Sequence, residues 1–124
     1  MKFKNGQEVF DHVINHLVTQ GNRSYSTLMC VYRSPEGMSC AVGCLMSDKE
    51  YHPDMEGEDV TSLIKKFDQV RWMRKYHGLL GNLQDLHDTR ANWLDEGGLS
   101  PTGRKNIQDI ASSFGLNNPL QSEN

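Results

Sequence analysis

The chain has 124 residues, 36% of them hydrophobic and 23% charged, with a formal net charge of -3 and a pI near 5.9. This length fits one modest core, and we predict a single globular domain over residues 1–116 followed by a disordered polar tail over residues 117–124. The acidic balance lacks the basic footprint of nucleic-acid-binding proteins, so nucleic acid is not an expected partner.

The sequence also bears on where the protein works. No apolar run approaches the roughly 18 residues of a membrane span, and the first residues, MKFKNGQEVF, lack the apolar region of a signal peptide. We therefore expect no membrane partner and a cytoplasmic location. Three cysteines in a reducing compartment favour free thiols over a disulfide framework.

The first predicted element is an amphipathic helix over Gln7–Gln20, because apolar residues recur there three and four positions apart. Asn5 can cap its start, and Gly21 ends it. His12 and His16 lie four apart on one face, a separation that can chelate a metal ion, but the Glu of a HExxH motif is absent. A solvated polar stripe beside the core face is the simpler interpretation.

The central stretch, Cys30–Gly57, holds all three cysteines and most of the turn residues. Thr27–Arg33 is rich in β-branched, aromatic and apolar residues and predicts a strand. Ser34–Gly37 places proline and glycine where a β-turn requires them. Met38–Gly43 then returns, so the two segments together predict a β-hairpin.

A short turn follows the hairpin. Ser47–Glu50 has the spacing of a capping box, which predicts a one-turn helix carrying Tyr51. Pro53 ends this helix, because proline disfavours helical geometry in the residue before it. His52–Gly57 is then an exposed loop.

Several motifs of this region occur in a fixed order: CVYR, CAVGCLMSDKEY, DMEG and, further on, LLGNLQDLHD. With them the chain resembles a group of small uncharacterised bacteriophage and bacterial proteins, over about Glu8–Asp88. The resemblance brings no catalytic mechanism. It implies a phage or mobile-element setting, in which small proteins in the host cytoplasm bind host machinery, including defence systems.

Helical periodicity resumes in the second half of the chain. A short helix begins at Glu58 or Asp59, and the longest predicted helix follows over Val70–Asp88. Gly78 and Gly81 interrupt its pattern, at a cost of about 1 kcal/mol each against alanine. They are therefore expected where the helix packs closely against the hairpin or a ligand.

The last predicted helix begins with a serine cap and a proline at Ser100–Pro101 and ends at Gly115. Before it, the loop Thr89–Gly98 contains Trp93, which would mark an interface if it were exposed.

One part of the chain carries a cluster of five basic residues. Lys65 and Lys66 precede Arg71, Arg74 and Lys75. A solvated helix face explains this cluster most simply, and a surface for an anion or an acidic partner is the alternative.

The cysteines suggest two kinds of chemistry, zinc ligation and nucleophilic catalysis. Cys40 and Cys44 with His52 or His87 could ligate zinc, but CAVGC is not the usual CxxC, and strand geometry would separate the two thiols by about 13 Å. One of these cysteines with His87 and Asp88 could also form a nucleophile pair. Buried thiols and a structural histidine are the simpler interpretation, so we predict no metal and no cofactor.

The binding hypothesis rests on two sets of residues. Aromatic faces and arginine forks suit a nucleotide-like ligand, and acidic side chains suit a host protein. The predicted ligand-binding residues are Tyr32, Arg33, Tyr51, Arg71, Trp72 and Arg74. The predicted partner-binding residues are Asp48, Glu50, Asp54 and Glu56.

Together these features predict an α+β domain, in which a β-hairpin, with or without a third short strand, packs against the first and longest helices. A two-stranded sheet is marginal alone, so a third strand or a homo-oligomer would add stability. The predicted function is a non-enzymatic, phage-type inhibitor of a host defence system that masks a host protein or sequesters a nucleotide-like signal. The alternative is a small thiol- or metal-dependent enzyme using Cys40 or Cys44 with His87.

Overall fold

The computed structural model describes residues 3–26 and 29–121, and this part of the chain is mainly helical. The protein is 60% helix and only 4% strand, so the predicted α+β fold with a β-hairpin is wrong. The α-helices are α1 (Gly6–Gln20), α2 (Val60–Lys66), α3 (His77–Asp88) and α4 (Pro101–Ser113). The 3-10 helices are η1 (Gly43–Leu45), η2 (Pro53–Met55), η3 (Asp68–Tyr76), η4 (Arg90–Asn92) and η5 (Pro119–Gln121).

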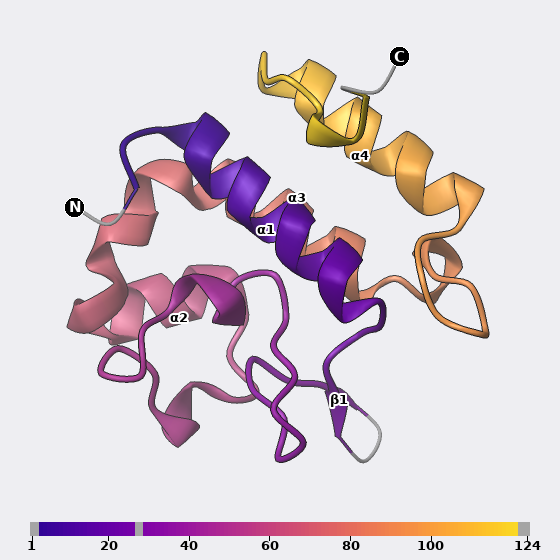
Figure 1. Cartoon of the computed structure of the whole chain (residues 1–124). Helices are drawn as coiled ribbons and strands as arrows, with labels where there is room; N and C mark the ends of the chain where they lie inside the picture. The colour runs from indigo at the N-terminus through magenta and orange to yellow at the C-terminus, as the bar shows by residue number, and fades with distance from the viewer. Residues whose placement is uncertain (1–2, 27–28, 122–124) are drawn as a thin grey trace.

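Helix α1 is central to the arrangement. It lies across α3, with α4 on one side of this pair and the irregular segment of residues 31–59 on the other (Figure 1). Its N-cap is Asn5, whose side chain accepts the Glu8 N–H, and its C-cap is Gly21 at φ 77°. The helix buries most of its apolar face, as the periodicity predicted, and leaves Val18 exposed. The buried residues are Val9, Phe10, Val13, Ile14 and Leu17.

The hairpin prediction fails between its two expected strands. Ser34–Gly37 does form the turn, since the Gly37 N–H donates to the Ser34 carbonyl at 3.0 Å. Beyond that turn, however, pairing is limited to an isolated bridge between Arg33 and Ser39. The chain then coils into η1, which packs on α1, and Ala41, Val42 and Leu45 are fully buried there. Gly43 is required at this place, because a Cβ would collide with the Tyr32 carbonyl.

The strand pairing that does occur lies earlier in the chain. β1 (Tyr25–Ser26) pairs antiparallel with β2 (Met29–Cys30), in the register Tyr25 to Cys30 and Ser26 to Met29. Residues 27 and 28 of the predicted strand lie outside the described residues. A ladder of two residues on each side adds little to the core, which the helices provide.

The predicted long helix Val70–Asp88 is divided in two. Its first part is the 3-10 helix η3, which is kinked at Val70 (φ -113°, ψ 20°), and α3 begins only at His77. Val70, Met73 and Tyr76 are all buried and three positions apart. That spacing matches the three residues per turn of a 3-10 helix, so this winding keeps all three on the core side.

The end of α3 is held by a buried histidine. The Ser24 N–H donates to His87 Nε2 at 2.8 Å, and His87 Nδ1 lies 2.7 Å from Asp88 Oδ1. Trp93 Nε1 donates to the His87 carbonyl at 2.9 Å, and Trp93 is only 8% exposed. Trp93 is therefore a core residue rather than an exposed interface anchor.

The last helix begins where the sequence predicted. The Ser100 hydroxyl caps α4 by accepting the Gly103 N–H at 3.0 Å. Gly103 is needed there, because a Cβ would collide with the Asn92 carbonyl. After α4 the chain returns to the start of α1, where Asn117 and Gln7 exchange two hydrogen bonds of 2.9 Å. The remainder of the predicted tail, residues 122–124, lies outside the described residues.

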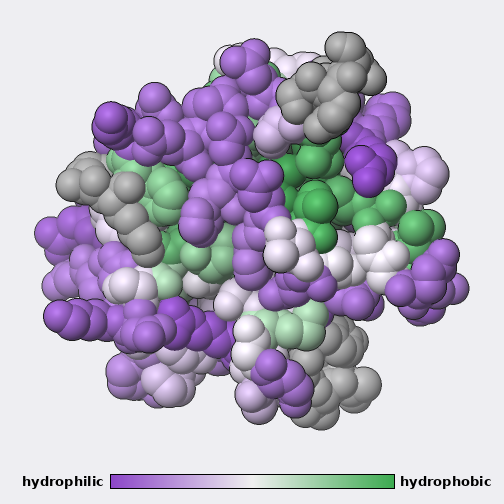
Figure 2. All heavy atoms as spheres, in the orientation of Figure 1, coloured by the Kyte–Doolittle hydropathy of each residue, from purple (hydrophilic) through white to green (hydrophobic). Residues whose placement is uncertain are grey.

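Most of the surface seen in Figure 2 is polar, with an apolar band between α1 and α4. The large apolar side chains most exposed in the described part of the chain are Val18 (42%), Leu94 (39%) and Phe114 (39%). Within residues 3–26 and 29–121, no helix has the length and apolar character needed to cross a membrane.

Candidate functional site

The segment of residues 31–59 is organised around one carboxylate. Glu56 Oε1 accepts the Tyr32 N–H at 2.9 Å, while Oε2 accepts the Arg33 N–H at 3.1 Å and the Tyr51 hydroxyl at 2.6 Å. The Arg33 guanidinium stacks over the Tyr51 ring at 4.8 Å. Three predicted ligand-binding residues therefore come together, but around the chain's own anion.

Both tyrosines of this cluster act as neutral donors. Burial, the hydrogen bond to Glu56 and the charge of Glu56 raise the pKa of Tyr51 to about 12. Tyr32 donates its hydroxyl to the Glu58 carbonyl at 2.6 Å, and burial is the main cause that raises its pKa well above the usual value. Neither phenol ionises at neutral pH.

The other predicted ligand-binding residues lie on η3, away from Glu56. Trp72 donates its indole N–H to Glu50 Oε2 at 2.9 Å and packs against Phe3, with 5.7 Å between ring centroids. Arg71 pairs with Asp68 at 2.6 Å, and Arg74 is exposed. These residues do not share a cavity with Arg33 in the described structure.

The predicted partner-binding residues have different environments. Asp48 is almost fully exposed and pairs with Arg33 at 2.8 Å. Asp54 is also exposed, 3.6 Å from His52. Glu50 instead holds a turn, because its Oε1 accepts the Ser47 N–H at 2.8 Å, and Glu56 holds the cluster described above. Two of the four thus serve the fold.

Cys40 and Cys44 do not form a catalytic arrangement with His87. Cys40 is fully buried, its sulfur accepts the Gly43 N–H at 3.2 Å, and burial strongly raises the pKa of its thiol. His87 has both ring nitrogens engaged, by Ser24 and Asp88, so neither is free to take a proton from a thiol. Cys44 donates its S–H to the Ala41 carbonyl at 3.1 Å.

The two histidines of α1 are also occupied. His12 Nε2 lies 3.1 Å from the Cys44 carbonyl oxygen, and His16 Nε2 lies 2.9 Å from the Ser39 carbonyl oxygen. They anchor residues 39–44 to α1. Among the described residues, no group of three His, Cys, Asp or Glu side chains is arranged to hold a metal ion.

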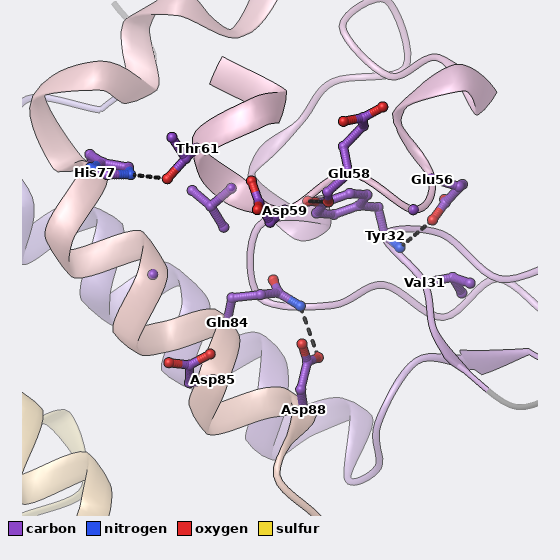
Figure 3. A pocket seen from close by; sticks show the side chains of 13 residues that line it. Val31, Tyr32, Glu56, Glu58, Asp59, Thr61, His77, Gln84, Asp85 and Asp88 are labelled. Carbon is purple, nitrogen blue, oxygen red and sulfur yellow. Dashed lines mark hydrogen bonds between the residues drawn. The ribbon is translucent and has the colours of Figure 1, made fainter. Parts of the chain in front are cut away.

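A cavity lies between α3 and the segment of residues 56–61, and we call it the acidic hollow. Its volume is about 440 Å³. Figure 3 shows Gln84, Asp85 and Asp88 entering from α3 and Asp59 and Thr61 from the other wall. Its lining carries five carboxylates and no lysine or arginine. Those carboxylates belong to Glu56, Glu58, Asp59, Asp85 and Asp88.

The carboxylates of the acidic hollow are neutralised to different degrees. Asp88 accepts from Gln84 Nε2 at 2.9 Å in addition to His87, and Glu58 pairs with Lys66 at 3.0 Å. Asp59 caps α2, and its hydrogen bond from the Ser62 N–H lowers its pKa, so it is ionised at neutral pH. Asp85 is exposed, and its carboxylate has no partner among the described residues.

His77, the first residue of α3, borders the hollow where α3 approaches α2. Its Nε2 lies 2.7 Å from the hydroxyl of Thr61 in α2. Gly81 forms part of the α3 wall, and a Cβ there would meet nothing within 4 Å. The glycine therefore leaves space in the hollow and is not required for close packing. Gly78 faces the Phe114 ring instead, and a Cβ placed on Gly78 would lie at an ordinary contact distance from that ring.

Sequence reasoning named Glu56 as a partner-binding residue and Glu58 or Asp59 as the start of a helix, but it missed the α3 contribution to this cavity. A signal for it exists, since Gly81, Gln84, Asp85 and Asp88 follow one another at intervals of three, one and three. This is the spacing of a polar helix face. The apolar stripe on the opposite face is the stronger pattern in this segment, so it determined the prediction.

Comparison with protein-family models, with curated proteins and with solved structures finds no match for this chain. The function is therefore argued from the chemistry of the acidic hollow and its surroundings.

Proposed function

We propose that this chain is a non-enzymatic binding protein that masks a host protein, and that the acidic hollow receives a lysine or arginine side chain of that partner. The observation that carries the proposal is the gathering of five carboxylates around one cavity without a lysine or arginine in its lining. Charge complementarity of this kind steers association and selects partners. The phage setting implied by the ordered motifs makes a host defence protein the partner we propose.

The same charges argue against the hollow as a nucleotide site, because phosphate groups would meet carboxylates there. Arg71 and Arg74 lie elsewhere and do not offset this repulsion. The enzymatic alternative has no support from Cys40, which is buried, or from His87, which is fully hydrogen-bonded.

Two substitutions test the hollow with little risk to the fold. Asp85→Asn removes a charge from an exposed carboxylate that holds no other group. Gly81→Arg places a guanidinium in the hollow from a position with open space around it. Glu96→Gln is the matched control, because Glu96 is exposed and does not line the hollow.

The probe is a fluorescein-labelled peptide of alternating lysine and arginine, with a glutamate peptide as the negative probe, measured by fluorescence anisotropy at near-physiological salt. We expect Asp85→Asn to weaken binding about tenfold, the loss of one charged contact. Gly81→Arg should abolish binding, and Glu96→Gln should leave it unchanged. Equal weakening by Glu96→Gln and Asp85→Asn, or no binding at this salt, would overturn the proposal. Host-lysate capture with Gly81→Arg as the blank then identifies the partner.

A further inference from the structure

A second cavity lies between α1 and the segment of residues 39–46, and we call it the α1 groove. Its volume is about 450 Å³. Its lining differs from that of the acidic hollow, because it contains an arginine and two histidines and no Asp or Glu. The lining residues are His12, Asn15, His16, Thr19, Arg33, Ser39, Gly43, Cys44 and Met46.

The hydrogen bonds of the groove fix how its histidines are protonated. A carbonyl oxygen only accepts, so His12 and His16 each carry a hydrogen on the Nε2 that faces Cys44 and Ser39. Each Nδ1 then has no partner among the described residues. A proton taken up there makes the ring cationic without breaking the contact to residues 39–44.

The guanidinium of Arg33 is held in place at the groove. Its Nη1 donates to Asp48 at 2.8 Å, its Nη2 donates to the Met46 carbonyl at 2.9 Å, and its plane stacks on Tyr51. The side chain is still 27% exposed. Its remaining N–H groups have no partner among the described residues, so an oriented cation with spare donors borders the cavity.

We infer that the α1 groove is a binding site for a phosphate-bearing anion. Arg33 supplies the fixed charge, and His12 and His16 add charge when protonated. Asn15 and Thr19 are exposed one helical turn apart on the same face and provide neutral donors. The absence of carboxylates from the lining makes this cavity suited to an anion in a chain whose net charge is -3.

The test is an NMR titration of the full chain with inorganic phosphate, with sodium chloride as the ionic-strength match. We expect saturable shifts of the His12 and His16 rings and of the Arg33 side chain. Arg33→Gln should weaken binding about tenfold, in line with the loss of a charge-assisted hydrogen bond. Asp48→Asn should strengthen binding, because it frees the Nη1 of Arg33.

Asn15→Asp keeps the test decisive if Arg33→Gln is poorly folded. It places a carboxylate in the groove from an exposed helix position, so it should abolish the phosphate shifts. Thr102→Asp adds the same charge on α4 outside the groove and should leave binding unchanged. Equal effects of the two aspartates, or shifts that do not saturate, would refute the site.

Adenosine monophosphate and phosphoserine, titrated in parallel, identify the source of the phosphate by which of them binds more tightly. Either result supports the site. The result is separable from the proposed function, because Gly81→Arg blocks the acidic hollow and should leave the α1 groove unaltered.

Discussion

At the scale of single residues, Glu56 has the largest structural role of the side chains predicted to bind a partner. It satisfies two consecutive backbone N–H groups and a tyrosine hydroxyl. The two adjacent N–H groups each donate to a different oxygen of this one carboxylate. Glu56, the glutamate of the DMEG motif, is thus an internal ligand for the loop of residues 31–33.

Glu56→Ala should therefore destabilise the protein by about 2–4 kcal/mol, because several charge-assisted hydrogen bonds are lost together. Urea denaturation followed by circular dichroism measures the change. Glu36→Ala is the control, since Glu36 is exposed at the turn, and it should change stability by less than about 0.5 kcal/mol. Acetate added to Glu56→Ala should restore part of the lost stability, because its carboxylate can take the place of the missing Glu56 carboxylate. Equal stability of the two variants would contradict this role.

At the scale of the helices, Gly81 in α3 and Gly103 in α4 have opposite roles. Gly81 has open space around it, whereas Gly103 lies against the Asn92 carbonyl. Helix propensity treats both alike and predicts a gain on replacement by alanine. The atoms around each glycine decide whether replacement by alanine stabilises or destabilises the protein.

Gly81→Ala should stabilise the protein by about 0.5–1 kcal/mol. Gly103→Ala should destabilise it by more than about 2 kcal/mol, because backbone must move to admit the methyl group. Thermal unfolding of the two variants and the wild type makes the comparison. A gain for both substitutions would show that α4 shifts freely against Asn92.

The helices also show which patterns the sequence predicts well. Helices α1 and α4 were predicted within a few residues, because caps and apolar periodicity agree there. The division at Tyr76 was missed, because spacings of three and four both fit an α-helix. The strand prediction for residues 38–43 is wrong, because alternation of small and larger residues also suits an irregular segment, of which residues 40–43 are buried.

At the scale of the whole molecule, two hydrogen-bonded tyrosine hydroxyls, those of Tyr32 and Tyr51, link the loop region to alkaline stability. The folded-state pKa of Tyr51 is raised from 10.0 to about 12, so the folded protein retains a proton that the unfolded chain loses. The stability from this group is complete below the unfolded value and declines as pH rises through the folded one. Tyr32 adds to the effect in the same direction.

We expect the urea midpoint to fall between about pH 10 and about pH 12, the interval set by Tyr51. Tyr51→Phe should reduce this fall, because phenylalanine has no proton to lose. Tyrosinate absorbance followed in parallel shows whether ionisation and unfolding coincide. An unchanged pH dependence in Tyr51→Phe would contradict the assignment.

The candidate site was the least predictable level. Sequence reasoning grouped Tyr32, Arg33 and Tyr51 with three residues of η3 as ligand-binding and gave no indication of which would meet. The structure brings these three together around Glu56. Sequence reasoning did not foresee that Glu56 fills the space between them, since sequence gives no direction for a side chain. The acidic hollow joins residues from α3 and the 56–61 segment, and only the tertiary packing brings these together.

The bond from the Ser24 N–H to His87 has a consequence for hydrogen exchange. Ser24 lies in the linker between α1 and β1, where amides ordinarily exchange rapidly with solvent. Its amide is buried, and its acceptor is a side chain rather than a backbone ladder. Deuterium uptake at this one amide therefore reports the opening of the α3 end directly.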